Sequence, residues 1–295
     1  AETPKSSDIP KRTGYWWSKN WFYTVLIAVA VIGGLSAFGL PLIVSQPFSA
    51  GDSISTLRQA ILAATGGVLA ILTLWENRRK NIQEKEKNDQ DHTHQVHAER
   101  RSRYAKAIEQ LADEKAPIRL GGVYTLIKLV DEWLGDEKTL PSKEERREEG
   151  QVIINSLCAY IRSTFDLASK TEALSQDETP GNYEGGTQQF TKDQARFREE
   201  KELRLTILDA IKTRLNSGTI TQENGTKKPI KGPWSNFDYD FSNARFFYPA
   251  NFADSYFGAS SNFTQTTFTG DKEFKHSAFF RNSVFIKEAN FSDAT

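Results

Sequence analysis

The C-terminal stretch decides the fold of this 295-residue chain, because one aromatic residue recurs in it at nearly constant spacing. Residues 241–295 read FSNARFFYPANFADSYFGASSNFTQTTFTGDKEFKHSAFFRNSVFIKEANFSDAT. From Phe241 onward, a phenylalanine follows after five residues and then after six, and this alternation holds until the last two spacings, which are both six. A short fixed period is typical of solenoids, in which each repeat packs only on its neighbours.

Each of these phenylalanines is expected to face the interior of a coil, together with a small residue two positions earlier. Ala250 precedes Phe252 in this way, and Ser255 precedes Phe257. The remaining positions are mostly polar and are expected to face solvent. With about 20 residues per coil, the stretch makes two to three coils. The predicted interior residues are Phe246, Phe252, Phe257, Phe263, Phe268, Phe274, Phe279, Phe285 and Phe291.

This pattern resembles the pentapeptide-repeat family. The resemblance implies a right-handed quadrilateral β-helix over residues 237–295, with the phenylalanine and the preceding small residue inside. The extra residue in every second repeat departs from the strict five-residue pattern and is similar to a subgroup with such insertions, which leaves the corner geometry open. The repeat reaches Thr295 with no capping helix, so we expect that the natural chain continues or that this end meets a partner or a second copy.

Two apolar stretches near the N-terminus predict a transmembrane helical hairpin over residues 21–75. Residues 21–45 carry no charge, and a helix of this length exceeds a hydrocarbon core of about 30 Å. A cleaved signal peptide is disfavoured because its apolar core is shorter. Residues 54–75 carry a single charge, Arg58, which is close enough to the end to reach the interface.

Basic residues predict the orientation of this hairpin in a bacterial plasma membrane. The segment 1–20 has four Lys or Arg residues, and five more lie between Arg78 and Lys87. The connecting loop 46–53 has none. Because cytoplasmic flanks carry the excess of Lys and Arg, we expect both termini to be cytoplasmic.

Small residues recur at four-residue spacing in both apolar stretches, which lets helices approach closely in lipid. Two interpretations remain open: the two spans pack on each other, or they offer a docking face to another membrane subunit. The residues predicted to pack in this way are Gly33, Gly34, Ala37, Gly66, Gly67 and Ala70.

The middle of the chain reads as helical. Residues 76–102 are charged and lack Pro and Gly, which predicts a solvated helical stalk. Residues 103–216 predict an all-α cytoplasmic domain of short antiparallel helices with Cys158 in its core. A polar stretch near 166–195 predicts a flexible insertion, and 217–236 a linker.

The helical segment carries a second resemblance. The runs RYAKAIEQLADEKAPIRLGGVYTLIKLV, from Arg103, and IINSLCAYIR, from Ile153, are similar to the cytoplasmic region of bacterial two-span membrane proteins that end in pentapeptide repeats. The resemblance extends over residues 55–295. The fold class expected for the whole chain is therefore mixed, with a transmembrane α-helical hairpin, an all-α domain and a β-helix.

No pattern of catalytic or cofactor-binding residues is visible. The sequence has no Walker loop, no GxSxG, no HExxH and no paired cysteines. His94 and His97 are weak candidates for a metal pair, but a solvated helix face explains them better. The 38 basic residues equal the 38 acidic ones, which argues against a nucleic-acid binder, because such proteins need a basic face.

The sequence therefore predicts a non-catalytic, membrane-anchored interaction or scaffold protein, with no cofactor. One concrete form is an accessory subunit of a larger membrane complex, for example in respiration or transport. Its expected partners are the lipid bilayer and either subunits of that complex or further copies of itself. The alternative is a sensor or effector, in phage defence or stress, that acts through oligomerisation of its spans.

Overall fold

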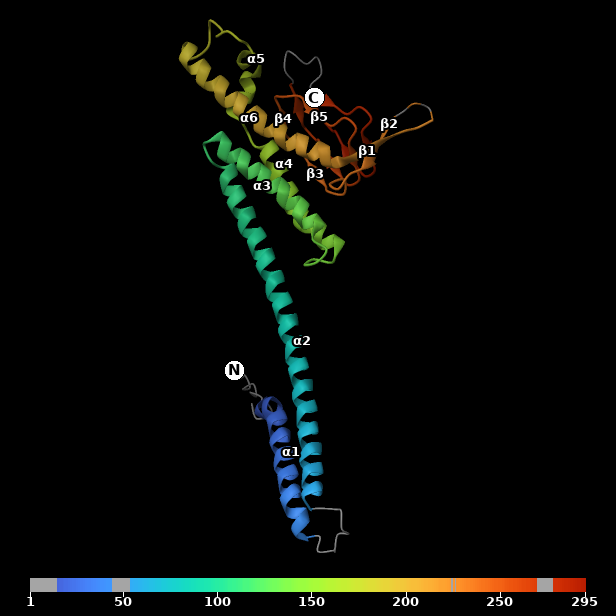
Figure 1. Ribbon diagram of the computed structural model, residues 1–295. Coiled ribbons are helices and arrows are strands. Elements are labelled where there is room, and N and C mark those ends of the chain that lie inside the picture. The colour runs from blue at the N-terminus through green and yellow to red at the C-terminus, as the bar shows by residue number, and fades with distance from the viewer. Residues whose placement is uncertain (1–14, 44–53, 224, 226, 270–277) are drawn as a thin grey trace, which may run out of the picture. The chain divides into compact units, whose positions relative to one another are not determined.

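A computed structural model gives the architecture of the chain (Figure 1). Long helices come first, a helical middle follows, and short stacked parallel strands come last. The chain divides into an N-terminal unit, residues 1–92, and a C-terminal unit, residues 93–295, and each is treated by itself. The structure describes residues 15–43, 54–223, 225, 227–269 and 278–295.

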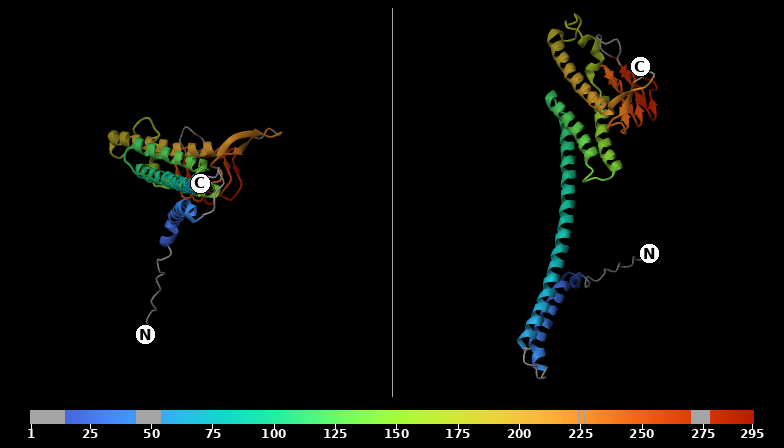
Figure 2. Two further views of the ribbon diagram at one scale, coloured as in Figure 1. Left: turned by 60° about the horizontal axis from the view of Figure 1, so that its bottom comes forward. Right: turned by 45° about the vertical axis from the view of Figure 1, so that its right-hand side comes forward.

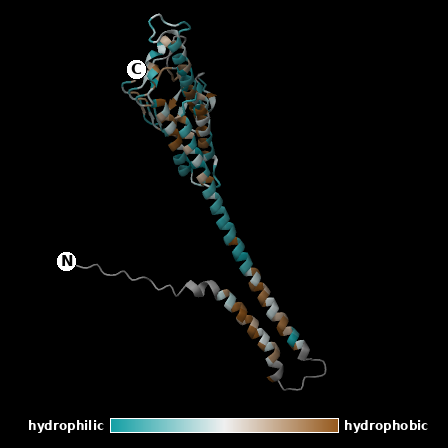
Figure 3. Cartoon of the chain, turned by 90° about the vertical axis from the view of Figure 1, so that its left-hand side faces the viewer, coloured by the Kyte–Doolittle hydropathy of each residue, from teal (hydrophilic) through white to brown (hydrophobic). Residues whose placement is uncertain are grey.

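The N-terminal unit is a pair of antiparallel helices. Helix α1 (Tyr15–Ile43) lies beside the first part of α2 (Ile54–Leu111) in Figures 1 and 2. Both contain an apolar stretch long enough to cross a hydrocarbon core, and almost none of either stretch is buried within the protein. Figure 3 shows long stretches of hydrophobic colour on these two segments. Two helices of membrane-spanning length and composition are therefore present, as the sequence predicts.

Helix α2 continues without a break well beyond its apolar stretch. Every side chain from residue 77 to residue 92 is exposed, and Figure 3 shows this part as hydrophilic. The ion pair Lys80–Glu76, one turn apart at 3.9 Å, lies at its start. The absence of Pro and Gly between residues 76 and 111 lets the helix run on.

Besides the end of α2 and two short helical segments, the described part of the C-terminal unit contains three long helices. These are α3 (Ala116–Gly135), α4 (Lys143–Arg162) and α6 (Gly186–Leu215). Pro117 stands in the first turn of α3, where its missing N–H costs nothing, and Ser142 caps α4 by accepting the Glu145 N–H. Cys158 is buried in the core, as predicted.

Two polar segments carry more structure than the sequence suggests. Residues 166–195, expected as a flexible insertion, contain a 3-10 helix (Asp166–Lys170), α5 (Thr171–Leu174) and the first turns of α6. Buried Leu174 and Phe190 fix this segment to the core. The expected linker 217–236 contains most of an antiparallel β-hairpin, β1 (Asn216–Thr221) with β2 (Lys227–Lys231), which projects from the unit in Figures 1 and 2.

Among the described residues, nine two-residue strands build the C-terminal coils. They pair in register as four parallel stacks, β3-β7-β11, β4-β8, β5-β9 and β6-β10, and form a β-solenoid-like region. The right panel of Figure 2 shows these short arrows side by side. The strands are β3 (Tyr239–Asp240), β4 (Arg245–Phe246), β5 (Ala250–Asn251), β6 (Tyr256–Phe257), β7 (Ser261–Asn262), β8 (Thr267–Phe268), β9 (Ala278–Phe279), β10 (Val284–Phe285) and β11 (Ala289–Asn290).

The coils are longer than the expected 20 residues. Tyr239 pairs with Ser261, which is 22 residues further on, because two five-residue and two six-residue repeats complete a coil. Ser261 in turn pairs with Ala289, which is 28 residues further on. The second coil therefore holds six additional residues between β8 and β9.

This insertion changes which phenylalanine enters the core. Ala250 pairs with Ala278 and Asn251 with Phe279, so Phe279 takes an outward position and Phe280 takes the inward one. The Phe280 ring stacks on that of Phe252, with centroids 5.3 Å apart. The prediction of Phe279 as the interior residue is thus replaced by Phe280. Phe274 lies outside the described residues.

The other interior rings stack at the spacing of the strands. Phe257 lies over Phe285 at 4.7 Å, and Phe263 lies over Phe291 at 4.8 Å, with the rings nearly parallel. These distances match the 4.7–4.9 Å between neighbouring strands. The rings of the first coil are fully buried, whereas Phe291 in the last coil is 39% exposed. Phe246 pairs in the same way with the partly buried Phe268.

Residues with a left-handed backbone conformation stand at the corners of the coils and agree with the register of the strands. Each lies two positions after an interior phenylalanine, where it has a φ of 55–60°. Asn and Asp tolerate this conformation better than other non-glycine residues. The five residues are Asn243, Asp254, Gln265, Asn282 and Asp293.

Candidate functional site: the helical hairpin and the polar clusters of the C-terminal unit

The two helices of the N-terminal unit meet along one narrow face of each. Gly33 and Ala37, one turn apart on α1, are buried. A Cβ at Gly33 would overlap the side chain of Thr65 on α2. Thr65 in turn donates its hydroxyl proton to the Ile61 carbonyl, 2.7 Å away. A glycine is therefore needed at position 33 for α1 to approach α2 this closely.

The other predicted packing residues do not lie in this contact. A Cβ at Gly34, Gly66 or Gly67 would meet no atom within 4 Å. Ala63, Gly66, Gly67 and Ala70 are all exposed. At about 100° per residue they lie about 100–160° around α2 from Thr65, away from the contact with α1. We call these four residues the small-residue face of α2.

A polar lock holds the end of α2 against the turn between α3 and α4. Arg100 donates to the Asp136 carboxylate at 2.5 Å, and the Thr139 N–H donates to the same side chain at 2.9 Å. Burial raises the pKa of Asp136, but the hydrogen bonds from Thr139 and Arg100 outweigh it and hold that pKa well below its usual range.

His97 belongs to this lock, and His94 does not. The Nε2 atom of His97 lies 3.0 Å from the Thr139 hydroxyl, and its ring packs on Trp133 at 5.1 Å. His94 is exposed. Among the residues that the structure describes, no group of three or more His, Cys, Asp or Glu side chains could hold a metal ion.

A buried ion pair forms a second cluster, which the sequence analysis missed. Arg204 on α6 is 1% exposed and donates to Glu200 at 2.6 Å and to the Ile161 carbonyl at 2.8 Å. Tyr160 donates to the other oxygen of Glu200 at 3.0 Å. Glu200 and Arg204 are four residues apart and stand among the regularly spaced apolar residues of α6. This spacing was the available signal for an ion pair on the buried face of the helix.

This cluster lines a pocket of about 520 Å³, yet its charges are already paired within the protein. Burial and the neighbouring Glu200 raise the pKa of the Tyr160 hydroxyl, so this group stays protonated at neutral pH. Glu200 is held by Arg204 and Tyr160 and has Arg119 at 3.7 Å. The arrangement therefore joins α4 to α6, and its groups are placed for structure.

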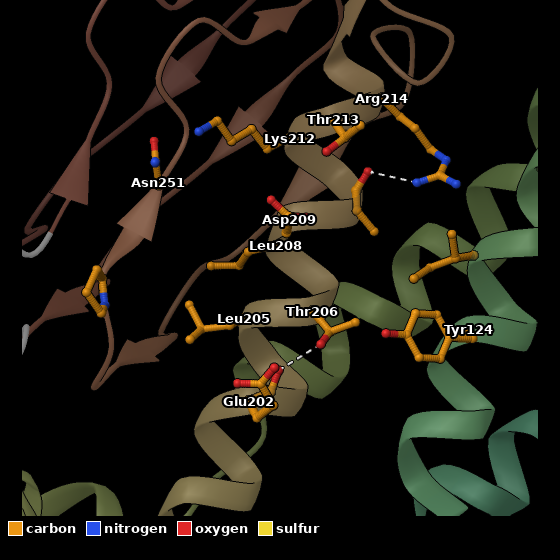
Figure 4. Close-up of a pocket in the computed structure, with 13 residues that line it drawn as sticks. Tyr124, Glu202, Leu205, Thr206, Leu208, Asp209, Lys212, Thr213, Arg214 and Asn251 are labelled. Atoms are coloured by element: carbon orange, nitrogen blue, oxygen red, sulfur yellow. Dashed lines mark hydrogen bonds between the residues drawn. The ribbon is translucent and has the colours of Figure 1, made fainter. Parts of the chain in front are cut away.

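A larger groove of about 650 Å³ runs along α6 (Figure 4). Tyr124 of α3 lies on one side of the helix and Asn251 of β5 on the other. The charged side chains that line the groove belong to α6 and include both acids and bases. One of them, Arg214, forms an ion pair at 2.8 Å with Asp131, which does not line the groove.

The thiol of Cys158 is in its unreactive, protonated form. Burial raises the pKa of Cys158 to about 12, so almost none of it is the reactive thiolate at neutral pH. This placement agrees with a core role.

Comparison of the chain with protein-family models, curated proteins and solved structures found no match. The sequence and the geometry above are therefore what the functional proposal rests on.

Proposed function

We propose that this protein is a non-catalytic scaffold, anchored in the bacterial plasma membrane by α1 and α2, with both termini in the cytoplasm. Its C-terminal unit presents a cytoplasmic surface, and residues 237–295 form a right-handed β-helix of the pentapeptide-repeat type. The four stacks of strands and the stacked rings support the last assignment. The apolar surface of the helical hairpin supports the membrane anchor.

The observation that carries the interaction role is the small-residue face of α2. It points away from α1, so packing among the residues that the structure describes does not use it. In lipid, such a face lets another helix approach closely. We therefore favour an accessory subunit of a larger membrane complex, which docks a neighbouring helix at Gly67.

The first experiment is extraction of the tagged full-length protein. Resistance to alkaline carbonate and release by detergent would support the membrane anchor, whereas release by carbonate alone would contradict it. Mild-detergent extracts would then be analysed on native gels with mass spectrometry. Co-migration with other membrane proteins at fixed stoichiometry is expected.

Two variants sharpen this test. Gly67→Leu fills the small-residue face and is expected to abolish co-migration. Val68→Phe adds the same number of carbon atoms at an exposed position about 100° around α2 from Gly67 and is expected to preserve it. Equal behaviour of the two variants would contradict docking at this face.

The same face also fits the alternative function, a sensor or effector that acts through self-association of its spans. A homo-oligomer that Gly67→Leu dissociates, without other subunits, would favour this alternative. A monomer in mild detergent would contradict both forms.

A further inference from the structure

A group of three cations follows directly after the aromatic end of the α2 apolar stretch. Arg78, Arg79 and Lys80 are all exposed, and we call them the basic collar. The Arg79 guanidinium lies 5.7 Å from the Trp75 ring centroid, and the Lys80 ammonium lies 5.9 Å from that of Tyr23 on α1. The collar therefore stands at the level where both helices carry exposed aromatic rings.

The height of the collar matches the headgroup layer. Trp and Tyr mark the membrane–water interface, and Arg78 to Lys80 lie three to five residues beyond Trp75. At 1.5 Å per residue this is about 4.5 to 7.5 Å. The polar layer of one leaflet is about 5 to 7.5 Å thick, so the three charges fall within it.

The charge along α2 then reverses. Residues 76–83 hold the three cations and one acid, Glu76, which lies 3.9 Å from Lys80, whereas residues 84–91 hold four acids and two bases. Lys85 and Lys87 stand about 15 to 18 Å beyond Trp75, which is past the headgroups. They also alternate with Glu84 and Glu86, which weakens their attraction to an anionic surface.

We propose that the basic collar is a binding site for anionic phospholipid headgroups of the cytoplasmic leaflet. The ligand chemistry is a lipid phosphate with a net negative headgroup, such as phosphatidylglycerol. The acidic segment 84–91 is repelled by the same surface, which keeps this part of α2 off the membrane. The proposal rests on the membrane anchoring proposed above.

The test measures lipid selectivity of the full chain reconstituted in phosphatidylcholine vesicles. Spin-labelled phosphatidylglycerol or phosphatidylcholine is added in trace, and electron paramagnetic resonance gives the fraction of each lipid immobilised on the protein. We expect the wild-type protein to prefer phosphatidylglycerol about fivefold, since one basic residue at an anionic surface contributes about this factor. Added salt should reduce the preference.

Matched variants assign the effect to the collar. The triple variant Arg78→Gln, Arg79→Gln, Lys80→Gln should lose the preference. The triple variant Lys85→Gln, Lys87→Gln, Lys106→Gln removes the same charge from exposed positions on α2 and should retain it. Inorganic phosphate should reduce the preference no more than sodium chloride of equal ionic strength, because the site takes a headgroup at the bilayer surface.

Three results would overturn the proposal: a wild-type protein without selectivity, equal loss in both variants, or displacement by phosphate beyond the salt effect. Flotation of the vesicles separates this failure from failure of the anchor. A chain that floats with the vesicles but shows no preference contradicts only the lipid site. A chain that does not float contradicts the membrane anchor and the lipid site with it.

Discussion

At the scale of single residues, Phe280 and its neighbour Phe279 are expected to differ in their contribution to stability. Phe280 packs edge-on against Phe263 and Phe291 and face-on against Phe252. Phe280→Ala should lower the free energy of unfolding by about 3 kcal/mol, since it leaves a cavity among these rings. Phe279→Ala, at an outward position, should cost about 1 kcal/mol or less. Chemical denaturation followed by near-UV circular dichroism would measure both, and equal losses would contradict the assigned register.

The corner at Asn243 should depend on backbone conformation rather than on side-chain contacts. Asn243 is exposed and has a φ of 60°. Asn243→Gly should leave the melting temperature nearly unchanged, because glycine adopts this conformation freely. Asn243→Val should destabilise the coil by about 1–2 kcal/mol, because a β-branched residue is strained there. A valine variant as stable as the glycine variant would show that this corner is not strained.

At the scale of elements, the polar lock should make the attachment of α2 to the turn after α3 sensitive to acid. The depressed pKa of Asp136 means that its stabilisation is complete above the unfolded carboxyl value of about 3.9 and is lost as pH falls toward the folded value. Asp136→Asn should therefore cost about 1–3 kcal/mol at pH 7. The difference from the wild-type protein should shrink below about pH 4.

Denaturation at several pH values would measure this difference. The exposed Asp177→Asn serves as the control and should track the wild-type protein throughout. A constant gap between wild type and Asp136→Asn down to strongly acidic pH would show that the carboxylate charge is not what holds the lock.

At the scale of the whole C-terminal unit, helices and coils share one core and are expected to unfold together. Asp131 on α3 accepts from Arg214 on α6 at 2.9 Å and from the indole of Trp234 at 2.8 Å. Trp234 is fully buried, and it leads into the first coil. Gly150 of α4 lies against Phe237, where a Cβ would come within 2.7 Å of the ring.

Asp131→Ala should therefore raise amide hydrogen exchange in the helices and in the coils alike, by about 1–3 kcal/mol of lost stability. Arg101→Ala, which breaks an exposed ion pair with Glu149, should change exchange little. Faster exchange confined to the helices would mean that the coils form an independent unit.

The sequence predicts the features of this molecule that depend on local pattern. The apolar stretches gave the two long helices, and the spacing of phenylalanines gave the stacked coils. The register of the second coil was missed because spacing alone favours Phe279. The motif Phe280-Arg281-Asn282, which matches Phe241-Ser242-Asn243, was the better guide, since Asn and Asp tolerate the left-handed corner better than other non-glycine residues.

Long-range partners were beyond reach of the sequence. Asp131 and Trp234 are far apart in the chain, and no sequence pattern predicts that they form a hydrogen bond. The same holds for Arg100 with Asp136, where no spacing rule connects the two helices. The sequence names Gly66, Gly67 and Ala70 of the small-residue face as packing residues, but only the packing of Gly33 on Thr65 shows which face of α2 points away from α1.

The six residues added between β8 and β9 have a consequence for engineering. The strands on either side, β8 and β9, still pair in register with β4 and β5 of the coil before. The number of residues between β8 and β9 therefore does not affect how the rings stack. An affinity tag or fluorescent reporter inserted there should leave the solenoid intact, whereas the same insertion inside β7, between Ser261 and Asn262, would interrupt the β3-β7-β11 stack.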